Sequence, residues 1–371
     1  MTHQGRTATG RTVAVVGGGY GGAAVAAALD EHADVLLIEP KDAFVNAAGS
    51  LRALTRPDEW AERIFFPYDT LLKRGRQIRE YAAAVDPHGV TLAGGARVEA
   101  DYLVIATGSG YPYPAKTRTD SSPEAVAHFK ATHADLAAAR RVLIAGAGPV
   151  GLELAGEIKA VWPEKVVTIV DPAAELLPGY EPALRADLHR QLDLLGIELR
   201  LGTAFAAEPE LEPGSAGVVK VDLGTDQVEA DIWFRAYGAT VNSDYLGDAL
   251  APLDRDGRLP VTAKLNVDGH AHVYAVGDVT DVPEEKRAGS AMRHAEVVAA
   301  NIIAQINGEE PAGEYRPMPV PVVLLPLGPE HGVGQIPSED GPALLSPEDV
   351  AAWKGRDLMR GKFAELFGLP A

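Results

Sequence analysis

Two glycine-rich turns constrain the fold of this 371-residue chain more than any other feature. Their spacings are Gly17-x-Gly19-x-x-Gly22 and Gly146-x-Gly148-x-x-Gly151. Each follows a short apolar run, which predicts a buried strand, and each precedes an apolar segment of helical composition. A strand, a glycine turn and a helix in this order form the dinucleotide-binding fingerprint, in which a pyrophosphate lies at the helix N-terminus.

An acidic residue completes both fingerprints. The predicted strand 34–38 ends at Glu39, 17 residues after Gly22, and the strand 166–170 ends at Asp171, 20 residues after Gly151. A carboxylate at this place accepts hydrogen bonds from a ribose diol. One copy alone is also compatible with an ordinary glycine-rich turn in another βαβ unit, whereas two complete copies indicate two nucleotide sites.

Three further predicted strands end in glycine, which lets a ligand approach the backbone closely. Their ends are Thr107-Gly108, Gly238 and Gly277-Asp278. Asp278 is suited either to accept a hydrogen bond from the sugar-alcohol chain of a cofactor or to cap the helix that follows. Arg52 has two interpretations as well, because its guanidinium suits a cofactor phosphate but is equally typical of a solvated surface.

The order of elements predicts an α/β fold. Strands with a turn at 86–89 are expected within 77–92, and a strand pair within 257–267. Helices are expected over 120–139, 181–195, 290–306 and 347–367, and two strands lie in the Pro- and Val-rich stretch from residue 313.

Composition excludes several classes of function. The net charge of −18 argues against nucleic-acid binding. The chain has no cysteine, so disulfides, thiolate metal sites and dithiol redox chemistry are excluded. His270, His272, His294 and His331 are not spaced as a metal site, and we expect no metal. Residues 1–10 are expected to be a disordered leader without signal-peptide character, and no apolar run is long enough for a transmembrane segment, so a cytoplasmic location is expected.

Scattered identities add a family resemblance. They are Lys41-Asp-x-Phe with Leu51-Arg-Ala, Ala155-x-Glu-Ile-Lys with Pro163-Glu-Lys, Gly332-Val-Gly-Gln-Ile, and Lys354-x-Arg-Asp-Leu. With the two fingerprints, they make the chain resemble the two-dinucleotide-binding-domain FAD/NAD(P)H oxidoreductases, nearest to the ferroptosis suppressor protein branch of the apoptosis-inducing-factor family. Type II NADH:quinone dehydrogenases are more distantly similar.

This resemblance implies an architecture of two Rossmann-like domains, with the NADH-binding domain inserted into the FAD-binding domain, and a small α+β C-terminal domain. We expect the FAD domain over 1–112 and 244–312, the NADH domain over 113–243, and the C-terminal segment over 313–371. The expected FAD ligands are Gly17, Gly19, Gly22, Glu39, Arg52, Thr107, Gly108, Gly277 and Asp278. The expected NADH ligands are Gly146, Gly148, Gly151, Asp171 and Gly238.

The resemblance also implies that electrons pass from NAD(P)H through FAD to a quinone. The acid Asp171 favours NADH over NADPH, because a carboxylate repels a 2′-phosphate. The family places a lysine beside the flavin, which corresponds to Lys116, with Glu153 as its expected partner. Lys354 matches a second family lysine near the ring. Without the resemblance, each of these three would be interpreted as a surface charge.

The sequence does not determine which molecule accepts the electrons. The alternatives to a quinone are a ferredoxin- or rubredoxin-type carrier protein, a small aromatic substrate of specialised metabolism, or no substrate at all in an NADH-sensing, partner-binding flavoprotein. We expect no acylated N-terminus of the kind that places the mammalian relative on membranes. Its apolar C-terminal residues fit an acceptor tunnel, a peripheral membrane contact, a homodimer interface or the internal packing of a monomer.

Overall fold

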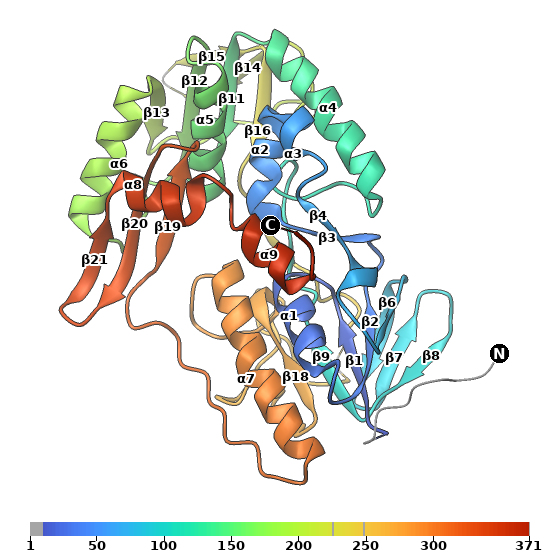
Figure 1. Ribbon diagram of the computed structural model, residues 1–371. Helices are drawn as coiled ribbons and strands as arrows, with labels where there is room; N and C mark the ends of the chain where they lie inside the picture. The colour runs from blue at the N-terminus through green and yellow to red at the C-terminus, as the bar shows by residue number, and fades with distance from the viewer. Residues whose placement is uncertain (1–9, 225, 248, 371) are drawn as a thin grey trace.

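The computed structural model describes residues 10–224, 226–247 and 249–370, so most of the expected leader lies outside the described residues. Two α/β units, one below the other in Figure 1, are joined by a C-terminal segment that contacts both. The predicted α/β class with two Rossmann-like units and a small C-terminal α+β part is confirmed.

The first unit is built on a five-stranded parallel sheet in the order β18-β9-β1-β2-β5. Its strands are β1 (Thr12–Val16), β2 (Asp34–Ile38), β5 (Arg76–Ile78), β9 (Tyr102–Ile105) and β18 (Val273–Ala275). The helices α1 (Tyr20–Leu29) and α7 (Ala288–Ile306) pack against each other, and the small side chains of α1 permit that close contact. Because the strands are parallel, all of their carboxyl ends lie at the same edge of the sheet, which faces the second unit (Figure 1).

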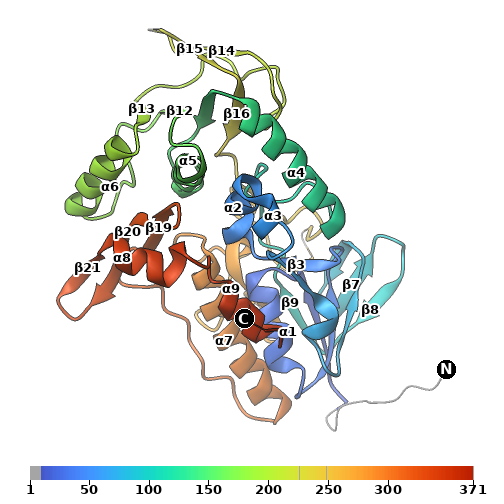
Figure 2. The same cartoon turned by 45° about the horizontal axis from the view of Figure 1, so that its top comes forward.

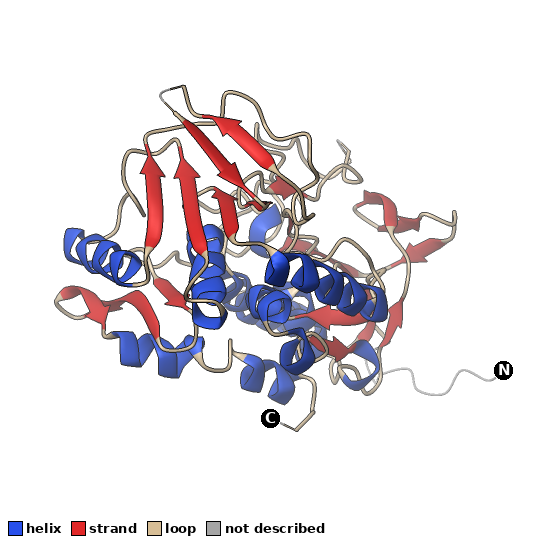
Figure 3. Cartoon of the chain, turned by 90° about the horizontal axis from the view of Figure 1, so that it is seen from above, coloured by secondary structure: helices blue, strands red, loops and turns tan. Residues whose placement is uncertain are grey.

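The second unit repeats this plan with a four-stranded parallel sheet in the order β13-β12-β11-β16. The strands are β11 (Arg141–Ala145), β12 (Val166–Asp171), β13 (Ile197–Leu201) and β16 (Ile232–Arg235). Its helices are α4 (Ser122–Ala138), α5 (Pro149–Val161) and α6 (Pro182–Leu194). Figure 3 shows the strands side by side with helices along one side, while the hairpin β14 (Val219–Asp222) and β15 (Gln227–Ala230) packs over Trp233 on the other.

Before the C-terminal segment, the chain crosses from the first unit to the second and back, and these two crossings pair. The short strands β10 (Ser109–Gly110) and β17 (Thr240–Val241) are antiparallel. β10 follows the end of β9, and β17 follows the end of β16. The chain therefore leaves the first unit and returns to it at one place. This pairing brings the expected ligand-binding ends of both sheets to the same interface.

Smaller elements complete the first unit. The predicted turn at 86–89 is confirmed as the hairpin β6 (Ala82–Asp86) and β7 (Gly89–Leu92), extended by β8 (Arg97–Glu99). The stretch 43–70 forms β3 (Ala43–Val45), η1 (Ala47–Gly49), α2 (Ser50–Thr55), α3 (Pro57–Trp60), β4 (Phe65–Pro67) and η2 (Tyr68–Thr70). The predicted strand pair within 257–267 is wrong, because the backbone makes only isolated bridges there: Val261 with Val267, Leu259 with Thr280, and Asn266 with Tyr274.

The C-terminal segment spans both units. Its antiparallel sheet, β19 (Val323–Leu327), β20 (His331–Ser338) and β21 (Gly341–Leu345), packs on α5 and α6. The predicted helix 347–367 is wrong as one element: it divides into α8 (Pro347–Val350), a π-helical turn (Ala351–Gly355) and α9 (Arg360–Leu366). The break lies where Leu358 and Met359 have φ of 51° and 61°.

Helix α9 then packs on the first unit through aromatic side chains. The ring of Phe363 lies 5.1 Å from that of Phe44, and the ring of Phe367 lies 5.5 Å from that of Phe66. In Figure 2, α9 lies in front of α1, and α2 lies between α4 and α5. The interface between the units is therefore closed on one side by the C-terminal segment.

Candidate functional site

The two glycine turns have the same internal geometry. Gly17 and Gly146 have φ of +100° and +110°, and a Cβ at these positions would lie 2.5 Å and 2.6 Å from the carbonyl oxygens of Ala106 and Ala236. A Cβ on the third glycine of each turn, Gly22 or Gly151, would lie 1.9 Å from the carbonyl oxygen of the first. The first and third glycines are therefore required by the fold itself.

The middle glycines, Gly19 and Gly148, are not required by close packing within the turns. A Cβ at either would meet nothing within 4 Å. Each is the N-cap of its helix and supplies no side-chain cap, so the first N–H groups of α1 and α5 lack a capping side chain. An uncapped helix N-terminus with a bare backbone beside it fits a pyrophosphate.

The predicted acids lie against these turns. Glu39 accepts a hydrogen bond from the backbone N–H of Gly18 at 2.7 Å, and Asp171 accepts one from that of Ala147 at 2.6 Å. Each carboxylate thus bonds the second residue of its own turn. The same contact in both units places each acid at the edge where a ribose diol would follow the pyrophosphate.

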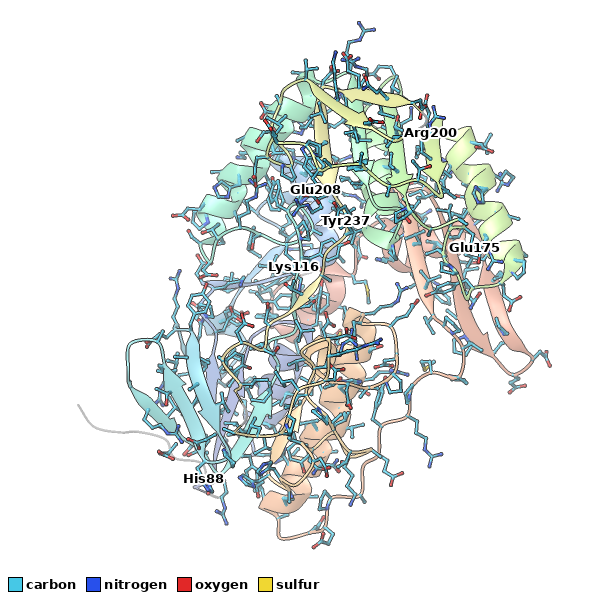
Figure 4. All side chains as sticks on the ribbon, turned by 180° about the vertical axis from the view of Figure 1, so that it is seen from behind. His88, Lys116, Glu175, Arg200, Glu208 and Tyr237 are labelled. Carbon is cyan, nitrogen blue, oxygen red and sulfur yellow. The ribbon has the colours of Figure 1, made fainter. Side chains whose placement is uncertain are left out.

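Lys116 and Asp278 are brought together by Ser109, which the sequence analysis did not single out. The Ser109 hydroxyl donates to Asp278 Oδ2 at 2.5 Å, and Lys116 Nζ donates to the Ser109 carbonyl oxygen. Burial lowers the pKa of the half-buried Lys116 ammonium, while the charge of Asp278 raises it and that of Lys41 lowers it. In Figure 4, Lys116 lies between the units, below Tyr237.

The expected pairing of Lys116 with Glu153 is wrong. Glu153, on α5, pairs with Lys354, whose Nζ lies 2.7 Å from Glu153 Oε1. Lys354 also donates to the Leu324 carbonyl oxygen at 3.0 Å. The partner differs because β19 docks on α5 and carries the π-helical turn of Lys354 to the first turns of that helix. π-Helical turns are frequent at functional sites.

Comparisons with known proteins agree with this geometry. The family model described as "Pyridine nucleotide-disulphide oxidoreductase" matches residues 11–297. The chain belongs to this family. Its curated relatives include apoptosis-inducing factor homolog B of Dictyostelium discoideum, 30% identical over 352 residues, or 89% of this chain and 90% of the relative. Ferroptosis suppressor protein 1 of Homo sapiens is 32% identical over 336 residues, 87% of this chain and 88% of the relative.

A solved structure extends the similarity of fold to the C-terminal segment. The sulfide:quinone oxidoreductase of Aquifex aeolicus superposes with a TM-score of 0.73 at 20% identity, covering 96% of this chain and 95% of that one. The predicted family and fold are therefore confirmed: the chain is an oxidoreductase of a family that binds FAD and NAD(P)H. Because it contains no cysteine, the disulphide chemistry in the family's name is absent from this pyridine nucleotide oxidoreductase.

Arg52 is a buried residue in this structure. The residue is 2% exposed, and its guanidinium donates to Glu157, with Nη2 2.6 Å from Oε1, and to the Arg356 carbonyl oxygen at 3.0 Å. These contacts join α2 of the first unit to α5 of the second and to the C-terminal segment. Arg52 is therefore not a surface residue. Its contacts connect the first unit, the second unit and the C-terminal segment.

The remaining expected ligands lie at the strand ends. Gly108, Gly238 and Gly277 have φ of +60°, +87° and +75°, which favours glycine. The Thr107 hydroxyl donates to the Asn242 carbonyl oxygen at 2.7 Å and so joins the two crossing segments. Gly277 N–H donates to Nδ1 of the buried His294 at 3.1 Å, a contact that no spacing in the sequence indicates.

Over residues 10–370, apart from positions 225 and 248, no three His, Asp or Glu side chains lie together as a metal site. His88 lies at the far end of the first unit from Lys116 (Figure 4). Within the same described part of the chain, no helix has both the length and the apolar character needed to cross a bilayer.

The contrast between Gly148 and Gly151 gives a testable prediction. Gly148→Ala is expected to leave the melting temperature unchanged but to raise the KM for NADH about tenfold, because the new methyl group blocks approach to the uncapped N–H groups. The matched variant Gly151→Ala is expected to unfold or lose solubility. Thermal denaturation and steady-state kinetics measure both effects, and an unchanged KM in Gly148→Ala would contradict this placement of the nucleotide.

Proposed function

We propose that the chain binds FAD at the first glycine turn and NADH at the second, and passes electrons from NADH to a quinone-like small molecule. The observation that carries the proposal is the repeated site: two uncapped helix N-termini, each with an open middle glycine and an acid on its turn. FAD, when bound, accepts a hydride from the nicotinamide and releases electrons to the acceptor. The residues of this chain bind and orient FAD and NADH, and they supply charge at the site.

Lys116 and Asp278 are proposed to face the flavin from the first unit. Asp278 follows Gly277 at the end of β18, and the Lys116 ammonium reaches the Ser109 carbonyl oxygen beside Gly108, where a Cβ would meet nothing within 4 Å. The Lys116 ammonium would stabilise negative charge on the reduced ring. Asp278, which already accepts from Ser109, would accept from the sugar-alcohol chain of FAD.

Glu153 and Lys354 are proposed to act from the other side of the interface. Their side chains are 13% and 16% exposed, so the pair is largely removed from water while still reachable. Glu153 lies one turn into α5, close to the proposed NADH turn, and it would orient Lys354 and contact the nicotinamide. Lys354 would donate a proton or a hydrogen bond to the acceptor oxygen.

A small surface pocket is our candidate for the place where a small-molecule acceptor binds. It measures about 280 Å³ and lies between the start of α7 and the stretch 317–322, with Pro283, Glu284, Met318 and Val322 in its lining. Glu284 bonds His294, which in turn bonds Gly277, and Val322 lies two residues before the Leu324 carbonyl that holds Lys354. A volume of this size is near the lower limit for a ligand pocket and holds a single ring.

Stopped-flow absorbance tests the function directly. We expect NADH to bleach the flavin of the purified protein, and a short-chain quinone to restore the colour faster than oxygen, an aromatic substrate panel or a ferredoxin. Fast re-oxidation by a ferredoxin would support the carrier reductase instead. A reduced flavin that no acceptor re-oxidises would support the NADH sensor, and a colourless protein that takes up no FAD would overturn the proposal.

Asp171 is proposed to select NADH. Asp171→Ala is expected to lower kcat/KM for NADH about tenfold, through loss of a charged hydrogen bond to the ribose, and to leave that for NADPH unchanged or higher. The matched control Asp193→Ala changes an exposed acid of α6 and should leave the ratio unchanged. An unaltered ratio of the two nucleotides in Asp171→Ala would show that this acid only holds its turn.

A further inference from the structure

A left-handed turn follows Lys354 and contains no glycine. Leu358 and Met359 are consecutive, with φ of 51° and 61°, a conformation that is unfavourable for residues with a Cβ. Such residues persist where the surrounding structure holds them. The turn also separates the π-helical turn that carries Lys354 from α9, so its shape determines where each of them lies.

Asn46 is the side chain that holds this turn from the first unit. Its Nδ2 donates to the Leu358 carbonyl oxygen at 2.9 Å, and Asn46 has no exposed surface. Its Oδ1 accepts from the Tyr20 hydroxyl at 3.0 Å, and that hydroxyl accepts from Ala48 N–H at 3.0 Å. Burial raises the pKa of Tyr20, so the hydroxyl keeps its proton and fixes which way the amide of Asn46 faces.

Leu358 connects Asn46 to the backbone of Lys354 through two hydrogen bonds. Its N–H donates to the Lys354 carbonyl oxygen at 2.7 Å while its own carbonyl is bound by Asn46. The Arg52 guanidinium fixes the same turn at the carbonyl of Arg356, 3.0 Å away. The backbone of Lys354 is therefore attached to the first unit, whereas its ammonium contacts Glu153 of the second unit at 2.7 Å.

We propose that Asn46 is a positioning residue, which fixes the left-handed turn and thereby keeps the Lys354 ammonium on Glu153. Through Tyr20, the first residue of α1, and Glu153 on α5, this network connects the two helices that start at the glycine turns. The kinetic consequence of the proposal rests on the proposed function of Lys354. The placement of the ammonium does not, and it can be measured separately.

Amine labelling followed by peptide mass spectrometry measures the placement. The FAD-loaded full chain is treated with an acetylating reagent, and the rate at Lys354 is divided by that at the exposed Lys73. In Asn46→Leu, of similar volume but without the amide, we expect this ratio to rise three- to tenfold, the equivalent of one lost buried hydrogen bond. Where Asn46→Leu fails to fold, Asn46→Ser, too short to reach Leu358, replaces it.

Asn301→Leu is the matched control. Asn301 is also buried, and its amide binds the carbonyl oxygens of Lys264 and Gly313, away from the turn. It should destabilise the protein without raising the Lys354 ratio. An equal rise in both variants, or full protection of Lys354 in a folded Asn46 variant, would overturn the proposal.

A suppressor separates positioning from general damage. Met359→Gly removes the left-handed penalty at one of the two positions of the turn, so it should restore part of the protection of Lys354 in Asn46→Leu and part of any lost turnover. Absence of rescue in both measurements would count against the proposal. Raised labelling with normal turnover would support the positioning role of Asn46 and would overturn the proposed role of Lys354.

Discussion

Lys116→Ala is expected to retain FAD but to lose about 100-fold or more of its NADH turnover, because the cation proposed to stabilise the reduced flavin is then missing. The absorbance spectrum measures the bound FAD, and stopped-flow reduction measures the step that is lost. Lys116→Arg keeps the positive charge and should retain much more of the rate. Turnover at the level of the unmodified protein in a FAD-loaded Lys116→Ala would exclude Lys116 from the reaction.

The pH dependence of turnover tests the same assignment. Burial lowers the Lys116 pKa from its ordinary 10.5, so the ammonium loses its proton at a lower pH than an exposed lysine. If turnover needs the charged form, it falls on an alkaline limb below pH 10.5. In Lys116→Arg the limb should move to higher pH, since an arginine stays charged.

Loss of stability does not account for such a limb. Between the folded-state pKa of Lys116 and 10.5 the unfolded chain binds more protons at this group than the folded chain does. Its contribution to the free energy of unfolding therefore rises with pH in that window. Thermal denaturation across the same pH range separates the two effects, and a limb with the same midpoint in Lys116→Arg would assign it to another group.

The sequence predicted the glycine turns well because their requirements are local. Gly17 and Gly146 need a positive φ, and Gly22 and Gly151 need the absence of a Cβ, and all of these follow from a few neighbouring residues. Parallel pairing of the strands on either side follows from the same βαβ pattern. The family and the two-unit α/β fold could thus be inferred before any tertiary contact was known.

The ion pairs could not be predicted, because their partners are far apart in the sequence. Glu153 and Lys354 are 201 residues apart, and the contact depends on how β19 docks on α5. Arg52 was interpreted as a phosphate ligand or a surface residue, and its contact with Glu157 spans 105 residues. In both cases the residue type indicated a charge with a role, while only the fold determined the partner.

The C-terminal break escaped prediction for a related reason. Leu358 and Met359 are residues that a helix accommodates readily, and neither is a glycine or proline that would mark its end. The turn is held by Asn46 and Arg52, more than 300 residues earlier. The edge strand β21 was not predicted because it begins with Gly341 and Pro342, residues that are depleted in strands, and none of its side chains is buried.

A double-mutant cycle at Glu153 and Lys354 is expected to separate stability from chemistry. Either Glu153→Gln or Lys354→Met alone leaves an unpaired charge in a largely buried place, and should lower the free energy of unfolding by about 2 kcal/mol. The double variant carries no such charge and should recover most of that loss. Turnover should fall about 100-fold in all three, because none of them retains both proposed groups.

The ion pair between Arg141 and Asp231 supplies the control for this cycle. Its Nη2 and Oδ1 atoms are 2.5 Å apart, and it lies at the opposite ends of β11 and β16 from the glycine turn. Neutralising both partners should change stability without changing turnover. If the double variant of Glu153 and Lys354 also regained its turnover, the pair would be an interdomain clamp, and the proton or hydrogen bond for the acceptor would have to come from another group.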